Sequence, residues 1–324
     1  MPASKNRALR RRGVFAAVGV VAALVLTACG GDSNNSAGSA GSSSSAGSAG
    51  SSSAAGTSSS AGSSSSSSSA SASGASGGGG GSASGAGLME SGTLTVGMNL
   101  QFKPEMYLDN GKPAGYDVDL LNALANSMGV KLSVQNLDFN GLIPGLQAKK
   151  FDIVSVGLTP NPDRKKVIDF SRSYVPYSSV LAVKADYSGP ATIDAFNTGG
   201  TTITALQGSS DETLAKTSFP KAEIQGLSDQ NATLLEVQTG RAKGAVLEDY
   251  LLAQYVKANK NSVKQADLPK PLSLSYGSWG VQKGNTKLVS TLDTFLCKSQ
   301  SDGTLAKLYQ KDFGASFPTM PGGC

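Results

Sequence analysis

The sequence predicts an α/β fold in which two lobes are joined by two chain crossings. From Leu94 onward, short apolar runs alternate with stretches of helical spacing, the pattern of repeated βα units in open sheets with helices on both faces. This alternation stops near 183–190 and the chain returns near 273–281, as expected for a hinge. The globular body, about Leu88 to Cys324, has 237 residues, enough for two lobes with separate cores.

The elements of the body follow in order from local signals. Apolar side chains recur at helical spacing between Asp117 and Met128, and Gly129 supplies a helix stop. The apolar run Phe151 to Val156 predicts a buried strand that leads into a Gly-Leu-Thr turn. Further strands are expected at 94–98, 130–136, 201–206, 222–225 and 244–247, a returning segment at 272–281, and helices at 141–149, 191–197, 209–217, 229–239, 249–259, 285–298 and 302–311.

The first 29 residues resemble an export signal. A basic start precedes the apolar run Val14 to Leu26, whose 13 residues are too few to span a bilayer as a stable helix. The run ends in the letters LTAC, which fit the small-residue box of a bacterial lipoprotein signal, so we expect residues 1–28 to be cleaved and Cys29 to be acylated. A short anchor retained intact is the alternative, and the segment RRRGVF also resembles a twin-arginine signal, which leaves the export route open.

The charge of the chain is balanced outside this signal. The whole chain carries 28 Lys and Arg against 23 Asp and Glu. The five excess cations all lie in the basic start, at Lys5, Arg7, Arg10, Arg11 and Arg12. The net charge of +5 therefore gives no indication of nucleic-acid binding, and we expect no nucleic-acid partner.

A segment without large apolar side chains follows the signal. Residues 32–87 contain only Ser, Gly, Ala, Asn, Thr and one Asp, so they have nothing to contribute to a core. We expect 29–87 to be a disordered tether, and as a flexible coil its length gives a typical end-to-end distance of roughly 40 Å. Such a tether holds the globular body near a membrane and lets it turn.

Two cysteines remain after Cys29, namely Cys297 and Cys324. Outside the cytoplasm such a pair favours a disulfide, which would tie the C-terminal tail to the last helices. The alternative is an ordinary free cysteine in a helix.

Arg164 lies just beyond the predicted strand 151–156, where open α/β sheets bind their ligands. Its guanidinium is planar and permanently charged, and its fixed fork of donors matches a carboxylate. A surface cation in a polar loop is the alternative. The chain contains no histidine, which removes Ser–His–Asp and Cys–His nucleophilic sites and the commonest metal ligand, so we expect no cofactor and no metal.

Several motifs together resemble the bacterial extracellular solute-binding proteins of family 3, the amino-acid receptors of ABC importers. They are GYDVDLL from Gly115, GLTPNPDRKKVIDFS around Arg164, FNGLIPGLQAKKFD and DGTLAKLYQKDFG. The resemblance covers Leu94 to Gly314. It implies the two-lobed periplasmic-binding-protein fold (type II), two open sheets joined by a two-crossing hinge, with lobe 1 at 88–184 plus 277–324 and lobe 2 at 185–276.

The resemblance also implies roles for individual residues. Arg164 would grip the α-carboxylate of the ligand, helped by Thr159, while the carbonyl of Gly157 accepts from the α-ammonium. Ser209 and Ser210 open a helix whose N–H groups suit a carboxylate, although a plain Ser N-cap is the alternative. Asp249 would pair with the α-ammonium. Because the chain carries an extra residue near Lys243, Glu248 is a second candidate for that role.

Aromatic residues complete the expected pocket. Phe102 and Phe139 match two family aromatics, so the ligand side chain would lie between their rings, although a lone Phe is more often part of a core. Tyr174 and Tyr177 fit either the pocket or core and hinge packing. Leu206 is a further candidate. Glu105 is another, because Lys103-Pro104-Glu105 replaces the family's double proline and following aromatic.

Asn99 stands where family members for cationic or amide side chains often have an aspartate. A neutral residue there removes a charge partner for the ligand, so the resemblance indicates a polar, neutral amino acid. The expected function is capture of this ligand by closure of the lobes, followed by delivery to an ABC permease driven by separate ATPase subunits. We expect a monomer outside the cytoplasm, anchored by lipid on Cys29.

Two other classes of function are compatible with the sequence. One is an enzyme on the same fold, similar to cyclohexadienyl dehydratases, in which Glu105 or Glu248 acts as general acid. The other is a tethered surface module that binds a wall or host partner. Neither is the expected function, which is binding without catalysis.

Overall fold

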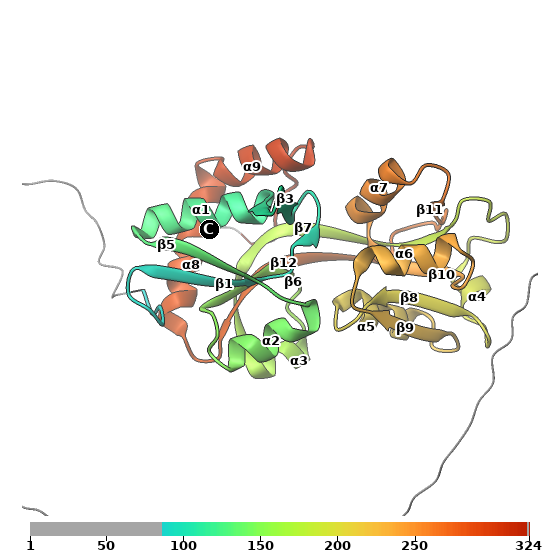
Figure 1. Cartoon of the computed structure of the whole chain (residues 1–324), viewed down its shortest axis with the longest axis horizontal. Helices are drawn as coiled ribbons and strands as arrows, with labels where there is room; N and C mark the ends of the chain where they lie inside the picture. The colour runs from blue at the N-terminus through green and yellow to red at the C-terminus, as the bar shows by residue number, and fades with distance from the viewer. Residues whose placement is uncertain (1–85, 323) are drawn as a thin grey trace, which may run out of the picture. The chain divides into compact units, whose positions relative to one another are not determined.

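The computed structural model describes residues 86–322 and Cys324. The predicted signal peptide (1–28), Cys29 and nearly all of the predicted tether (29–87) lie outside these residues. Two groups of helices and strands are connected by the long strands β7 (Ile168–Lys184) and β12 (Ser273–Gln282), as Figure 1 shows. Among the helices of residues 86–322, none is long and apolar enough to cross a membrane.

Nine strands of the described residues form one hydrogen-bonded sheet. Its order is β5-β1-β6-β12-β7-β10-β8-β9, and β11 also pairs with β7. The strands on either side of β12 and β7 are parallel to one another, whereas β7 and β12 run antiparallel to their neighbours. The two-lobed α/β fold class is therefore confirmed. The mainly parallel strands of the two lobes are joined through β7 and β12 into one continuous sheet, where two separate sheets were expected.

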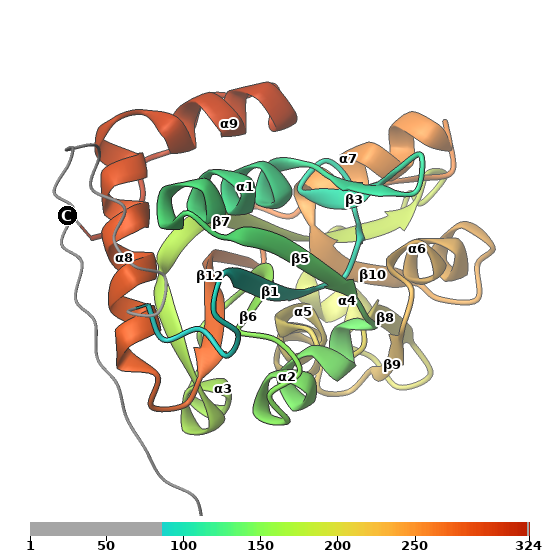
Figure 2. The same cartoon turned by 60° about the vertical axis from the view of Figure 1, so that its left-hand side comes forward.

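We call the group that contains the N-terminal strands the first lobe. Its sheet is covered by α1, α2, α8 and α9. In Figure 2, α1 and α9 lie above β1 and β5, and α2 lies below them. A small hairpin sheet of β2, β3 and β4 lies between β1 and α1 in the chain. The elements are β1 (Thr93–Met98), β2 (Gln101–Phe102), β3 (Met106–Asp109), β4 (Lys112–Ala114), α1 (Tyr116–Met128), β5 (Lys131–Asn136), α2 (Phe139–Gln147), β6 (Ile153–Leu158), α3 (Pro162–Val167), α8 (Thr286–Ser301) and α9 (Thr304–Phe313).

We call the other group the second lobe. It has a core of its own, in which Phe196, Phe219 and Val246 are fully buried. Its elements are α4 (Ile193–Phe196), β8 (Thr202–Leu206), α5 (Ser210–Ser218), β9 (Glu223–Leu227), α6 (Gln230–Gln238), β10 (Gly244–Glu248), α7 (Asp249–Ala258) and β11 (Val263–Gln265).

The connecting strands pair with each lobe along different parts of their length. β12 pairs with β6 of the first lobe between Ser278 and Val281, whereas β7 pairs with β10 of the second lobe between Ser179 and Ala182. The register of β7 and β12 shifts on both sides of Ser278, where β12 begins to pair with β6. Such irregular pairing bends a strand and increases its twist, which suits a hinge. The lobe limits expected at 184/185 and 276/277, at the end of β7 and inside β12, stay predictions.

The observed elements follow the expected order, with three differences. β6 runs to Leu158, so Gly157 and Leu158 belong to the strand and the turn begins at Thr159. The β2–β4 hairpin, the short helix α3 and the strand β11 were not expected. Nor was the full length of β7, because its buried positions follow no period of two and it contains Pro176.

Candidate ligand-binding site

A narrow cavity lies between the two lobes. The centre of a water molecule can occupy only about 30 Å³ of this cavity. A ligand must therefore enter by separation of the lobes. The first lobe lines it with Phe102, Glu105, Phe139, Val156, Gly157, Leu158, Thr159 and Arg164. The second lobe and β7 contribute Leu206, Ser209, Ser210, Asp211, Gln230, Glu248, Tyr250 and Tyr177.

Arg164 is positioned by the start of α3. Asn161 is the N-cap, and its Oδ1 accepts from the backbone N–H of Arg164 at 2.8 Å, while Pro162 takes the first helical position that suits its fixed φ. Arg164 as a whole is 7% exposed. Its NH1 donates to the carbonyl of Thr159 at 3.0 Å and its NH2 to the carbonyl of Gly208 in the second lobe at 3.1 Å. Arg164 therefore lies where the two lobes are in contact.

The charge of Arg164 persists in this buried position. Burial lowers the pKa of the guanidinium to about 10, although the nearby negative charge of Asp211 raises it. The guanidinium stays protonated at neutral pH, 5.9 Å from the centre of the Phe139 ring. It can bind an anion without any change of protonation.

The start of α5 faces Arg164 from the second lobe. The Oγ of Ser209 accepts from the N–H of Glu212 at 3.1 Å, and the Glu212 carboxylate accepts from the N–H of Gly208 at 2.7 Å. The Ser209 hydroxyl is therefore the N-cap of α5, which was the alternative interpretation of this residue. Ser210 and Asp211 occupy the first two helical positions, whose N–H groups have no acceptor within the helix and suit a carboxylate.

Two acids of the second lobe lie together at the cavity. Asp211 is 4% exposed, accepts from Ser179 Oγ at 2.6 Å and is hydrogen-bonded to Glu248. Burial raises the pKa of both carboxyls. The charge of Asp211 raises the pKa of Glu248 further, whereas the hydrogen bond with Glu248 lowers the pKa of Asp211. The pair therefore retains a proton more readily than free carboxylates do.

The structure places Glu248 in the cavity and Asp249 outside it. Glu248 ends β10 and lines the cavity, whereas Asp249 is the exposed first residue of α7. Successive side chains leave the end of a strand in opposite directions, so a shift of one residue changes which acid points inward.

Asn99, also expected at the ligand, is not among the residues that line the cavity. Its side chain is buried, donates to the carbonyl of Leu137 at 2.6 Å and accepts from Gln101 Nε2 at 2.5 Å. Gln101 in turn accepts from the backbone N–H of Gln230 in the second lobe at 2.7 Å. Asn99 thus supports a contact between the lobes.

The other expected residues come together. Phe102 and Phe139 both line the cavity, and their ring centres lie 6.4 Å apart in an edge-to-face arrangement of 79°. Thr159 and Leu206 line it as well. Gly157 has a φ of +55°, and a Cβ there would lie 1.5 Å from the hydroxyl oxygen of Tyr177, so no other residue fits this close approach.

Glu105 is the most deeply buried acid of the lining, with 1% exposure. One carboxylate oxygen accepts from Tyr177 of β7, and the other accepts from Tyr250 of α7 at 2.5 Å. Burial, together with the negative charge of Asp117, raises the pKa of Glu105 to about 8. The carboxyl is therefore mostly protonated at neutral pH.

A buried polar cluster lies behind Glu105. Asp117 accepts from Ser155 Oγ and from the Tyr174 hydroxyl, each at 2.6 Å, and Trp279 donates to Ser155 Oγ at 2.9 Å. Burial raises the pKa of Asp117 to about 7. Tyr174 thus belongs to the packing beneath the cavity, not to its lining.

Asp211, Tyr250 and Gln230 line the cavity but were not expected from the sequence. Asp211 directly follows Ser210 and Tyr250 directly follows Asp249, so each lies beside a predicted residue. Gln230 is the first residue of α6. Its place at the cavity depends on how the two lobes face each other, so no local sequence signal indicates it. In the described part of the chain, no group of three or more His, Cys, Asp or Glu is arranged to hold a metal ion.

This fold, with two lobes around a buried cavity, is that of the extracytoplasmic binding proteins that close around small ligands. The family can be stated more narrowly. The sequence pattern of the bacterial extracellular solute-binding proteins, family 3, matches residues 94–315, so this chain belongs to that family.

Known proteins agree with this assignment. The arginine-binding extracellular protein ArtP of Bacillus subtilis is 31% identical over 223 residues, which cover 68% of this chain and 86% of that protein. The crystal structure of the ancestral amino acid-binding protein AncCDT-1, a precursor of cyclohexadienyl dehydratase, is 33% identical with a TM-score of 0.63, covering 68% of this chain and 96% of that one. An ancestral arginine-binding protein bound to glutamine is 31% identical with a TM-score of 0.64, covering 70% and 100%.

Proposed function

We propose that this chain is the substrate-binding protein of an ABC transporter, which captures an amino acid between its lobes and delivers it to a membrane permease. The observation that carries the proposal is one buried cavity that combines Arg164 from the first lobe with Asp211 and Glu248 from the second. An amino acid presents a carboxylate and an ammonium on one carbon, and opposite charges in one cavity match both.

The ligand groups are assigned to the two lobes as follows. Arg164, Thr159 and the first N–H groups of α5 hold the α-carboxylate. Glu248, in place of Asp249, holds the α-ammonium together with the Gly157 carbonyl. Because these groups come from both lobes, the ligand binds the closed state more tightly and shifts the population toward it. The permease then recognises the closed form.

The class of ligand has support from related proteins. ArtP is named for arginine, and the ancestral arginine-binding protein was solved with glutamine. The sequence-based expectation of a neutral, polar side chain rested on Asn99. Since Asn99 lies outside the cavity lining, its neutrality does not decide the charge of the ligand.

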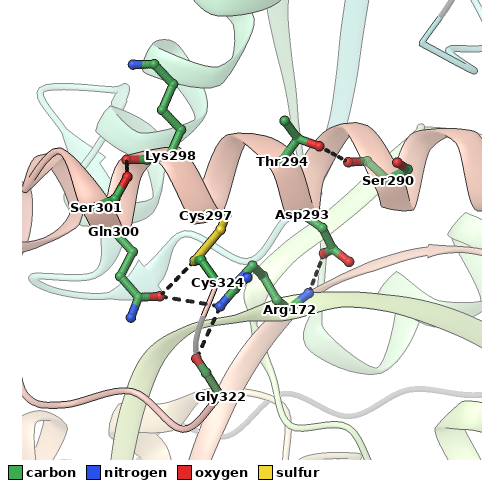
Figure 3. Close-up of a disulfide and its surroundings, with 10 residues drawn as sticks. All are labelled: Arg172, Ser290, Asp293, Thr294, Cys297, Lys298, Gln300, Ser301, Gly322 and Cys324. Atoms are coloured by element: carbon green, nitrogen blue, oxygen red, sulfur yellow. Dashed lines mark hydrogen bonds between the residues drawn. A yellow bond between two sulfur atoms is a disulfide. The ribbon is translucent and has the colours of Figure 1, made fainter.

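The front and the end of the chain complete the proposed function. Acylation of Cys29 would anchor the protein outside the cytoplasm, with residues 29–87 as the tether. The paired Cys297 and Cys324, drawn in Figure 3, lie with their Cα atoms 5.4 Å apart, a spacing typical of disulfides. We propose that this disulfide forms in the oxidising compartment and that the protein acts as a monomer.

Titration calorimetry of Arg164→Ala with amino acids tests the proposal. We expect loss of measurable binding, because the α-carboxylate loses its partner while Asp211 and Glu248 remain. Arg241→Ala is the matched control, since Arg241 pairs with Glu236 on the surface of the second lobe and should leave binding unchanged. Micromolar affinity retained by Arg164→Ala would contradict the assignment.

A dehydratase-like enzyme is the second candidate function. The observation that favours it is Glu105, a buried carboxyl in the cavity whose raised pKa suits a general acid. AncCDT-1 is itself described as a precursor of such an enzyme. Turnover of prephenate or arogenate by the purified protein would establish this function.

If no amino acid or small amine raises the melting temperature, a tethered surface module is favoured instead.

A further inference from the structure

The acids that line the cavity outnumber its cations. Among the lining residues that the structure describes, Arg164 is the cation, whereas Glu105, Asp211 and Glu248 are acids. An amino acid with a neutral side chain brings one carboxylate for Arg164 and one ammonium for the hydrogen-bonded pair of Asp211 and Glu248. Glu105 is then left without a cationic partner.

Glu105 has a different set of neighbours from Arg164. Its carboxylate contacts the hydroxyls of Tyr177 and Tyr250, whose rings stack at 6.2 Å with an interplanar angle of 25°. Arg164 instead contacts Thr159, Gly208 and the ring of Phe139. None of the ion pairs among the described residues includes Glu105.

We propose that Glu105 is the counter-charge for a positively charged group on the ligand's side chain, so that the ligand is a cationic amino acid. The inference rests on the proposed function, in which Arg164 holds the α-carboxylate. A cation at Glu105 would form a charge-assisted hydrogen bond in a buried place, the strong kind of polar contact.

The two tyrosines also explain how Glu105 is positioned. Tyr177 belongs to the connecting strand β7 and Tyr250 to α7 of the second lobe, so closure brings Tyr250 to the second carboxylate oxygen. Once the lobes are closed, both donors hold the carboxylate in a fixed orientation. A different role is that Glu105 serves only as a latch, because its bond to Tyr250 joins the lobes.

Titration calorimetry of the full chain with L-arginine and L-citrulline tests the inference. The two ligands have nearly the same shape, but citrulline carries a neutral urea in place of the guanidinium. We expect the wild-type protein to bind arginine about 10- to 100-fold more tightly, the range given by hydrogen bonds to charged groups. L-lysine against L-norleucine provides a second matched pair.

Two variants separate the counter-charge from the latch. Glu105→Gln should reduce the ratio of arginine to citrulline affinity to about 1–3, because only the interaction with the guanidinium is lost. Tyr250→Phe removes the bond between the lobes but keeps the carboxylate, so it should weaken both ligands alike and preserve the ratio. Circular dichroism melting of each variant checks that it is folded.

The outcomes distinguish the inference from the proposed function. Equal wild-type affinity for arginine and citrulline, or an unchanged preference in Glu105→Gln, would overturn the role of Glu105 while capture of amino acids stands. Binding of other amino acids but neither of these would do the same. If no amino acid binds at all, the proposed function fails and the inference fails with it.

Discussion

At the scale of single residues, burial decides how the acids of the cavity behave. Glu105 has a pKa of about 8 because it is removed from water and lies near the charge of Asp117. An acid in this state is held neutral at pH 7 by its surroundings, and a cation brought beside it would restore its charge. The same carboxyl can therefore accept a proton or a charged ligand group, but not both.

Binding of a cationic ligand should release a proton from Glu105. Its pKa in the closed structure is raised above the usual value, so the proton is bound below about pH 8 and must leave before a cation can pair with the carboxylate. We expect the affinity for L-arginine to rise about five- to tenfold from pH 6 to pH 7, and the binding enthalpy to depend on the ionisation enthalpy of the buffer.

L-Citrulline is the control, because a neutral side chain does not displace the proton. A pH-independent affinity for arginine over this range would contradict the assigned protonation. Asp117 on α1, Tyr177 on β7 and Tyr250 on α7 act on the pKa of Glu105. The charge of Glu105 in turn raises the pKa of groups on four elements, namely Tyr116 on α1, Tyr174 on β7, Glu248 on β10 and Tyr309 on α9.

At the scale of elements, two short helix starts build the cavity wall. α3 and α5 lie in different lobes, and each is capped by a side chain, Asn161 in one and Ser209 in the other. The caps fix where each helix begins, and the residues next in the chain then face the cavity. The local sequence thus sets the direction of Arg164, Ser210 and Asp211 once the lobes are closed.

Asn161→Ala should weaken ligand binding more than it weakens the fold. The change removes the acceptor for the Arg164 N–H and costs about 1 kcal/mol of local helix stability. Because α3 has only six residues, we expect its first turn to loosen and the affinity for the ligand to fall by about three- to tenfold, measured by calorimetry.

Thr192→Ala is the matched control for this cap. Thr192 caps α4, another short helix, and does not line the cavity. We expect a similar loss of stability, measured by chemical denaturation, and an unchanged affinity. Equal effects of both variants on binding would show that the cap of α3 does not position Arg164.

At the scale of the whole described body, the C-terminal tail is tied to the connecting strand. Cys324 pairs with Cys297 of α8, and the Gly322 carbonyl accepts from Arg172 of β7 at 3.3 Å (Figure 3). The backbone N–H of Arg172 also donates to Asp293 of α8 at 2.6 Å. These contacts hold the tail and α8 against the first-lobe end of β7.

Replacement of Cys297 and Cys324 by serine should lower stability without changing ligand affinity. The bond closes a loop with a sequence separation of 27, so its loss should reduce the free energy of unfolding by about 3 kcal/mol. Chemical denaturation under oxidising conditions measures this change. The reduced wild-type protein should match the double variant, and an unchanged midpoint would contradict a formed disulfide.

The sequence alone determined the order of elements and the family. Alternating runs and helix stops such as Gly129 are local signals, and so most strands and helices agree with expectation within a few residues. The position of Arg164 just beyond a strand end was also predictable, because the apolar run 151–156 marks the strand, although the helix α3 that carries Arg164 was not expected. These features depend on residues close together in the chain, so no partner from the other lobe is needed to predict them.

Only the tertiary structure decided which acids reach the cavity. Glu248 points inward and Asp249 outward because of the direction in which β10 ends, and Asn99 is turned away toward Leu137. Glu105 gains its environment from Tyr177 and Tyr250, which lie 72 and 145 residues away in the chain. The charge of a buried carboxyl depends on the groups that surround it in space, and closure of two lobes supplies those groups.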